Sequence, residues 1–119
     1  MKPMLAIALA LCAVTAVLAQ DHPPARASMD AQLVTSNAFV QVLRVSIPPR
    51  GKTPMHDVTP RVVVWLSDAH FVDRFADGSV REETRKAGDA EWVSARQHAA
   101  ENLSDAPMQF VAIVLTGTH

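Results

Sequence analysis

Histidine is the residue type in this chain with the clearest capacity for chemistry. His56, His70 and His98 fall in its central and C-terminal parts, and His119 ends the sequence. A neutral imidazole is a common metal ligand, and it also serves as a general base near neutral pH. The competing, simpler role of each central histidine is to hold a turn or to satisfy a buried polar group.

The sequence shows no signature of nucleophilic or phosphate-binding chemistry. Its single cysteine is Cys12, close to the N-terminus, and there is no Gly-rich phosphate loop. Ser36, Ser46 and Ser94 lack the flanking residues that mark a nucleophilic serine. Neither thiolate chemistry nor a serine nucleophile is therefore expected.

Acidic residues are predicted to form a solvated face. Glu82, Glu83 and Glu91 stand in polar strand or turn segments, which favours exposure to solvent over a catalytic carboxylate pair. The formal net charge of the chain is −1. This near-neutral balance argues against nucleic acid and against an anionic membrane surface as partners.

The elements that must position the histidines are predicted to be strands. Asp77-Gly78 stands between two β-branched or aromatic runs, which is a strong hairpin signal. Six or seven short strands separated by turn signals favour a sandwich or a barrel. Residues 94–102 are rich in alanine, but closely spaced turn signals flank them, so we interpret them as strand. The expected strands cover residues 39–47, 61–67, 69–75, 79–85, 91–93, 97–103 and 108–116.

The order of these features resembles a known family. A Pro-Pro-Arg-Gly turn is followed by a histidine, a valine-rich strand, an Asp-Gly hairpin, an Ala-Gly-Asp turn, and a second histidine with an asparagine four residues later. Over residues 38–116 this order resembles the small single-domain cupins, of the RmlC-like jelly-roll kind. The resemblance implies an all-β fold, a small single-domain jelly-roll β-barrel, in which motif histidines and a carboxylate point inward and hold a divalent metal.

The first cupin motif is only partly present. It consists of a glycine, a spacer, His-x-His, and a glutamate three or four residues later. Gly51 matches the glycine with a spacer one residue short, and His56 matches the first histidine. Val58 stands at the second histidine, and Val62, or Val63 with the longer spacing, stands at the glutamate. The resemblance therefore implies a degraded metal-binding motif.

The second motif runs from a glycine through Pro-x-Gly to a histidine and an asparagine. Gly88, His98 and Asn102 match it, whereas Ser94 and Arg96 replace the proline and the second glycine. The resemblance thus leaves His98 as the one metal ligand of this motif.

The ligand count is low for a metal site. His56 and His98 remain as candidate ligands, whereas catalytic zinc and non-haem iron sites normally take three protein ligands or more. Alternate residues of a strand share one face, so Val58 and Val62 are expected beside His56 if no bulge intervenes. These valines would make the pocket drier and raise the cost of holding a dication there.

Asp57 and His70 are the other residues that could add a metal ligand. Asp57 is expected on the face opposite His56, and His70 is a third ligand only if its strand faces inward. His98 and Asn102 share a strand face, which also suits a buried polar pair near the barrel mouth. The candidate ligand pocket comprises His56, Val58, Val62, His98 and Asn102.

The N-terminus has the pattern of a secretory signal peptide. Lys2 precedes an uncharged apolar run, and Ala19 stands at the expected cleavage site. The alternative is a retained anchor, but the run is about 14 residues, short of a spanning helix. We expect a signal peptide over residues 1–19, a flexible leader over 20–36 and the barrel over 37–119. The protein is then exported, to the periplasm or the medium, with no stable membrane span after cleavage.

Three hypotheses of function stay open. The first is a domain that binds a small molecule in the barrel, with no complete metal site and no catalysis. The second is a metal-dependent enzyme of the oxygenase or isomerase kind that uses His56 and His98, so the cofactor is either none or a divalent metal ion. The third is a module that pairs through an exposed strand, as in a homodimer.

Overall fold

The computed structural model describes residues 29–117, which form nine strands and, within that range, no helix. The all-β class is therefore confirmed, and no helix able to cross a membrane occurs among these residues. The strands are β1 (Asp30–Ser36), β2 (Val40–Ile47), β3 (His56–Val58), β4 (Arg61–Trp65), β5 (Ala69–Phe75), β6 (Val80–Arg85), β7 (Ala90–Val93), β8 (Arg96–Asn102) and β9 (Met108–Leu115).

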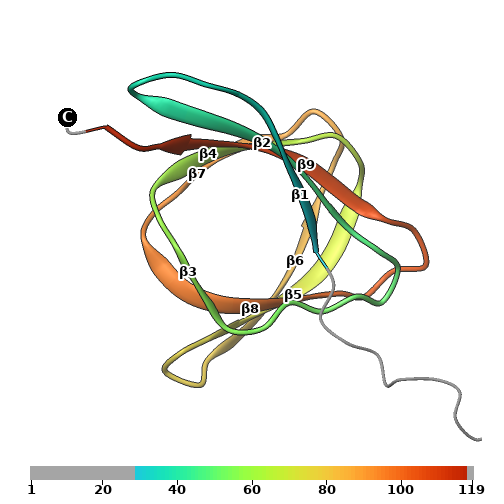
Figure 1. Cartoon of the computed structure of the whole chain (residues 1–119). Coiled ribbons are helices and arrows are strands. Elements are labelled where there is room, and N and C mark those ends of the chain that lie inside the picture. Colours follow the sequence, from blue (N-terminus) through green and yellow to red (C-terminus); the bar gives the residue numbers. More distant parts are fainter. Residues whose placement is uncertain (1–28, 118–119) are drawn as a thin grey trace, which may run out of the picture.

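Two antiparallel sheets curve around one axis to form a barrel (Figure 1). The five-stranded sheet has the order β1-β2-β9-β4-β7, and the four-stranded sheet has the order β3-β8-β5-β6. Only β1–β2 and β5–β6 are consecutive strands that pair directly. Every other connection carries the chain from one sheet to the other, which is the path of a jelly roll.

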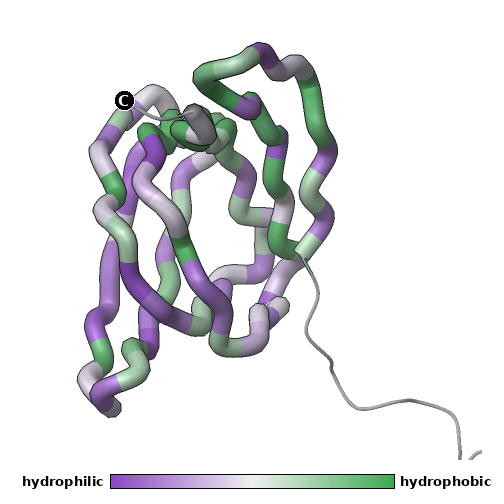
Figure 2. Tube along the Cα trace, turned by 60° about the vertical axis from the view of Figure 1, so that its left-hand side comes forward, coloured by the Kyte–Doolittle hydropathy of each residue, from purple (hydrophilic) through white to green (hydrophobic). Residues whose placement is uncertain are grey.

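Alternation of side chains along the strands builds the core inside the barrel. In β9, for example, Met108, Ala112 and Val114 are buried, and the residues between them are more exposed. Figure 2 shows this alternation as short hydrophilic and hydrophobic stretches along the tube. The central cluster of buried residues draws on both sheets: Ile47, Val58, Val63, Trp65, Ala69, Phe71, Val93 and Met108.

Two strands were not expected from the sequence. β1 lies within residues 20–36, which the sequence analysis assigned to a flexible leader, so that assignment is wrong for residues 30–36. Each residue of β1 is exposed, because the strand forms a sheet edge and pairs only with β2, and the alternating burial that marks a strand is missing. β3 is three residues long, too short for its pattern to be recognised. Residues 1–28, which hold the expected signal peptide, lie outside the described residues.

The Asp-Gly hairpin and the strand over residues 94–102 are confirmed. Gly78 has a φ of 92°, a conformation that favours glycine, and its N–H donates to the Phe75 carbonyl at 2.9 Å. The Ser79 hydroxyl and backbone N–H both donate to the Asp77 carboxylate, and these hydrogen bonds lower the pKa of Asp77. β8 occupies Arg96–Asn102 as a strand, with Ala100 and Asn102 facing inward.

Asn102 holds one end of the barrel together. It is fully buried, and its amide nitrogen lies 3.2, 3.1 and 2.8 Å from the carbonyl oxygens of Ile47, Pro48 and Ala106. Its carbonyl oxygen accepts hydrogen bonds from the backbone N–H and the hydroxyl of Ser104, each at 3.0 Å. The side chain therefore satisfies backbone groups that the chain would otherwise bury unpaired.

We expect Asn102→Asp to destabilise the fold strongly. Aspartate keeps the shape but replaces a donor by a carboxylate that faces carbonyl oxygens, so the predicted loss of unfolding free energy is about 3 kcal/mol or more. Urea denaturation followed by circular dichroism measures it. Ser104→Ala, which removes only one donor to Asn102, should cost about 1 kcal/mol. Equal stability of the native protein and Asn102→Asp would contradict the assignment.

Candidate functional site

A cavity of about 160 Å³ lies inside the barrel, between the two sheets. Its volume is close to that of an engineered cavity that takes up benzene, so it suits a molecule of about one small ring. Most of its wall is apolar. The apolar wall consists of Met29, Ala31, Leu43, Val45, Ile47, Val58, Val63, Trp65, Phe71, Val93, Ala100, Met108 and Phe110. The polar lining residues are Thr53, His56, Arg61, Asp73, Arg85, Glu91, Arg96 and His98.

The structure brings His56 and His98 together at this cavity. They form a direct cross-strand pair between β3 and β8, and their ring centroids lie 4.9 Å apart at 64°. His56 also holds a turn, because its Nδ1 lies 2.8 Å from the Pro54 carbonyl oxygen. A carbonyl only accepts, so Nδ1 carries the proton and Nε2 keeps its lone pair in the neutral ring.

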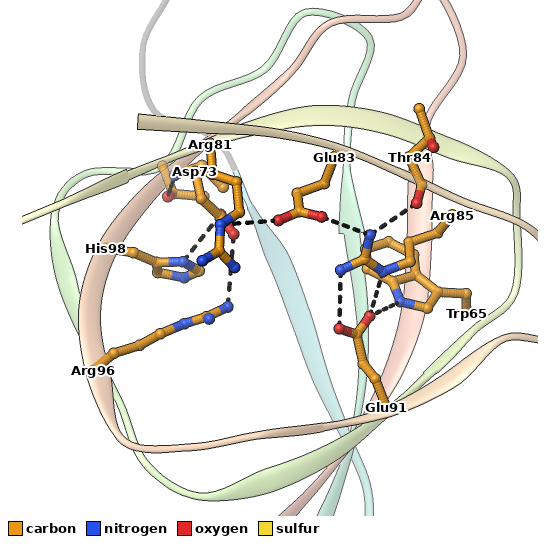
Figure 3. Close-up of polar contacts among 11 residues, drawn as sticks. Trp65, Asp73, Arg81, Glu83, Thr84, Arg85, Glu91, Arg96 and His98 are labelled. Carbon is orange, nitrogen blue, oxygen red and sulfur yellow. Dashed lines mark hydrogen bonds and ion pairs between the residues drawn. The ribbon is translucent and has the colours of Figure 1, made fainter. Parts of the chain in front are cut away.

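His98 faces a buried carboxylate, Asp73, that the sequence analysis missed. Asp73 lies on β5, and His98 Nδ1 is 3.1 Å from Asp73 Oδ1 (Figure 3). Arg96 approaches the other carboxylate oxygen, with Nη2 3.6 Å from Oδ2. We call Asp73, Arg96 and His98 the polar end of the cavity. A sequence signal for Asp73 does exist: it is an acidic residue within the mostly apolar run Ala69–Phe75, and it shares a strand face with Phe71, two positions earlier.

Several polar atoms of the polar end lack hydrogen-bond partners. Asp73 Oδ1, His98 Nδ1 and Arg96 Nε are buried, and none makes a hydrogen bond within the described residues. The 3.1 Å contact between His98 and Asp73 is thus an ion-pair distance without hydrogen-bond alignment. Asp73 Oδ1 and His98 Nδ1 therefore have each other as nearest polar neighbour, and Arg96 Nε has no partner among these residues.

A second polar group, the Arg85 cluster, draws on β6, β7 and the end of β4 (Figure 3). It consists of Arg81, Glu83, Arg85, Glu91 and Trp65. Arg85 binds Glu91 with two hydrogen bonds, Nε–Oε2 at 2.6 Å and Nη2–Oε1 at 3.0 Å. Trp65 Nε1 donates to the same carboxylate at 2.6 Å, and Glu83 accepts from Arg85 at 3.1 Å. The cluster therefore satisfies most of its own charges.

The pKa directions follow from this pairing. Burial alone would raise the pKa of Glu91, but hydrogen bonds from Arg85 and Trp65 and nearby positive charge lower it below its ordinary value. The hydrogen bond to Glu91 raises the pKa of Arg85 above its ordinary value, against the effect of burial. Both side chains therefore stay charged over the physiological range.

The predicted solvated face holds for only one of its three glutamates. Glu82 is exposed and bonds to His70. Glu83 and Glu91 are half-buried, and Glu91 lines the cavity, so the expectation is wrong for these two. The error for Glu83 arises because strand alternation half-buries Glu83 and Arg85 on β6, where the acid and the arginine neutralise each other.

Arg61 is the third cavity arginine, and it makes no ion pair with any described residue. Its Nε donates to the Thr59 carbonyl at 2.8 Å, and its Nη2 donates to the Thr59 hydroxyl at 3.2 Å. Burial lowers the pKa of Arg61, and the positive charge of Arg96 lowers it further. The two guanidinium groups therefore repel each other across this part of the cavity.

Three of the sequence-predicted residues lie away from the cavity. Val62 faces outward between Ile113 and Trp92, and Val63 takes its place in the wall. The corner at residues 59–60 shifts the inward-facing positions from even-numbered residues in β3 to odd-numbered residues in β4, so Val63 faces inward in place of Val62. Asn102 does not line the cavity, because its side chain hydrogen-bonds backbone groups at one end of the barrel. His70 faces outward toward Glu82, so it is not the third ligand sought beside His56.

Comparison with solved structures identifies the fold. A cupin domain from Bordetella pertussis Tohama I matches with a TM-score of 0.71 and 22% identity, over 77% of this chain and 97% of that chain. The polyketide cyclase RemF from Streptomyces resistomycificus matches with a TM-score of 0.62 and 14% identity, over 77% and 68%. The chain has the cupin fold. This confirms the predicted jelly-roll barrel.

Solved structures of this architecture differ in their described activity. A sugar phosphate isomerase of the cupin superfamily from Silicibacter pomeroyi matches with a TM-score of 0.53 and 18% identity, over 71% of this chain and 57% of that chain. No protein-family model matches the chain, and no curated protein matches it. The cupin likeness thus establishes the architecture and leaves the chemistry to the site.

The cavity of this domain does not supply the donors of a common metal centre. Among residues 29–117, no three His, Cys, Asp or Glu side chains are grouped so that they could hold a metal ion. His56 and His98 are adjacent, but Val58 lies beside them, and Asp57 faces outward to bond Gln97. Three protein ligands are the norm for mononuclear zinc and non-haem iron, so the described residues do not fit such a site.

We expect Glu91→Gln to destabilise the barrel in a pH-dependent way. At about pH 7 the substitution should lower the free energy of unfolding by about 1–2 kcal/mol, which lies between the values for exposed and buried ion pairs. The pKa of Glu91 in the folded protein lies below its ordinary value of 4.5. The stabilisation from its carboxylate is therefore fully present above pH 4.5 and disappears as the pH falls through the folded pKa.

Urea denaturation of both proteins at about pH 7 and about pH 3 measures this effect. The difference in unfolding free energy between native protein and Glu91→Gln should shrink at the lower pH. Glu82→Gln is the matched control, because that carboxylate is 63% exposed, and it should change stability little. A pH-independent difference for Glu91→Gln would contradict the predicted linkage.

Proposed function

We propose that this cupin-fold domain binds a small molecule inside its barrel, without a complete metal site. The observation that carries the proposal is the cavity of about 160 Å³, whose wall is mostly apolar and carries a small set of polar and charged residues. Ligand sites in proteins are typically concave and apolar, with a few convergent polar groups that fix orientation.

The apolar wall supports binding of a compact, ring-sized molecule. Trp65 and Phe71 stack with centroids 5.4 Å apart, and Phe110 lies 4.9 Å from Trp65, so aromatic surface covers one side. Burial of apolar ligand surface against such a wall is favourable by about 25 cal/mol per Å². These contacts would supply affinity, and the unpartnered atoms of the polar end would supply orientation.

We further propose that the domain acts after export. The support is the N-terminal pattern of a positive residue, an apolar run and Ala19 at the cleavage position.

Ligand entry should change the fluorescence of Trp65. Trp65 and Trp92 are the two tryptophans of the sequence, and Trp92 is exposed on the outer face, so Trp92→Phe leaves Trp65 as the single reporter. Titration of this variant with benzoate, benzamide and phenol should give a saturable change, with a dissociation constant of about 1 mM or tighter for at least one probe.

A filled cavity provides the control. Val63→Phe places a ring in the wall and should abolish the response, whereas Val64→Phe, on the next residue and the outer face, should preserve it. Circular dichroism verifies that both variants fold. Absence of a saturable response for all three probes would reject binding in this cavity.

The competing proposal, a metal-dependent enzyme that uses His56 and His98, predicts a stoichiometric transition metal. We expect none above background in the protein purified without a histidine tag, because the described residues provide two imidazoles and no third ligand grouped with them. Elemental analysis of the native protein and of the His56→Ala, His98→Ala double variant tests this. A stoichiometric metal that the double variant loses would favour the enzyme.

A further inference from the structure

We propose that the cavity selects a small organic monocarboxylate, whose carboxylate group lies between Arg61 and Arg96 while its apolar body contacts the wall. This inference rests on the proposed function and names the class of ligand. It depends on the placement, pairing and charge of the two arginines.

Two chain corners bring these arginines to the same part of the cavity. Arg61 is the first residue of β4, after the corner from β3, and Arg96 is the first residue of β8, after the corner from β7. Val58, the last residue of β3, pairs with Arg96. Val93, the last residue of β7, pairs with Arg61. The two corners therefore lie side by side. Both arginines line the cavity.

Neither arginine is neutralised as Arg85 is. Arg61 bonds only to Thr59 among the described residues. Arg96 approaches Asp73 at 3.6 Å, longer than a hydrogen bond, and its buried Nε has no partner (Figure 3). A buried or half-buried cation without a hydrogen-bonded anion is unfavourable, so both groups can gain from an acceptor in the cavity.

The charge of the cavity matches a single negative charge. Three arginines and two carboxylates line it, so its formal charge is +1 with neutral histidines. Glu91 is committed to Arg85, and Asp73 serves both His98 and Arg96. Burial and then the positive charge of Arg96 lower the pKa of Arg61, so the two cations lie close enough to repel each other.

A carboxylate fits these groups better than a spherical anion. The guanidinium group is planar and presents parallel N–H donors that match the two oxygens of a carboxylate. The rest of the cavity is lined mostly by aliphatic and aromatic side chains, which favour a compact apolar body. Benzoate combines both features, and benzamide is its neutral counterpart of nearly equal size.

Calorimetric titration of the native full chain with benzoate and benzamide tests the inference directly. Benzoate should bind about tenfold tighter, because charge-assisted hydrogen bonds are stronger than neutral ones. Equal affinity, or tighter binding of benzamide, would overturn the monocarboxylate assignment and leave the proposed small-molecule function intact. Failure of both probes to bind would overturn the monocarboxylate assignment, and failure of phenol as well would overturn the proposed small-molecule function.

Variants locate the anion. Arg61→Gln and Arg96→Gln should each weaken benzoate about tenfold and change benzamide affinity less than about twofold. Arg44→Gln, an exposed arginine on β2 away from the cavity, should change neither. Thermal unfolding verifies that each variant folds. Unchanged benzoate affinity in both cavity variants would overturn the placement, and the comparison of probes on the native protein stands even if one variant unfolds.

Discussion

The bidentate pair between Arg85 and Glu91 joins the edges of the two sheets, and the shape of the cavity depends on it. β6 and β7 are edge strands of different sheets, so no backbone ladder links them. Arg85 and Glu91 span the gap with two hydrogen bonds, and Trp65 fixes the same carboxylate from inside the wall. A charged pair thus does at this edge what backbone hydrogen bonds do elsewhere in the barrel.

The same pairing decides which groups of the cavity remain available. Because Glu91 neutralises Arg85, the other lining carboxylate, Asp73, is left beside Arg96 and His98. Arg61 has no acidic partner among the described residues. The polar lining of the cavity therefore carries more cations than acids, and the two motif histidines are only part of it.

The sequence predicted the fold and part of the candidate site correctly. His56 was predictable because motif spacing identified it, and strand pairing with His98 then placed both at the cavity. Val62 was misplaced because a corner changes strand parity, which a linear pattern does not record. Asp73 and Arg61 were missed because a charged residue within a strand looks the same whether it faces solvent or a partner across the barrel.

The corners that precede Arg61 and Arg96 have a consequence for how such barrels diversify. Each corner is two residues long, residues 59–60 and 94–95, and neither contributes to the central cluster of buried side chains. An insertion in one corner would shift one guanidinium group relative to the other while the buried cluster kept its composition. Ligand preference could then drift through changes in chain length at the rim, at little cost to folding, so that barrels of one shape come to serve different molecules.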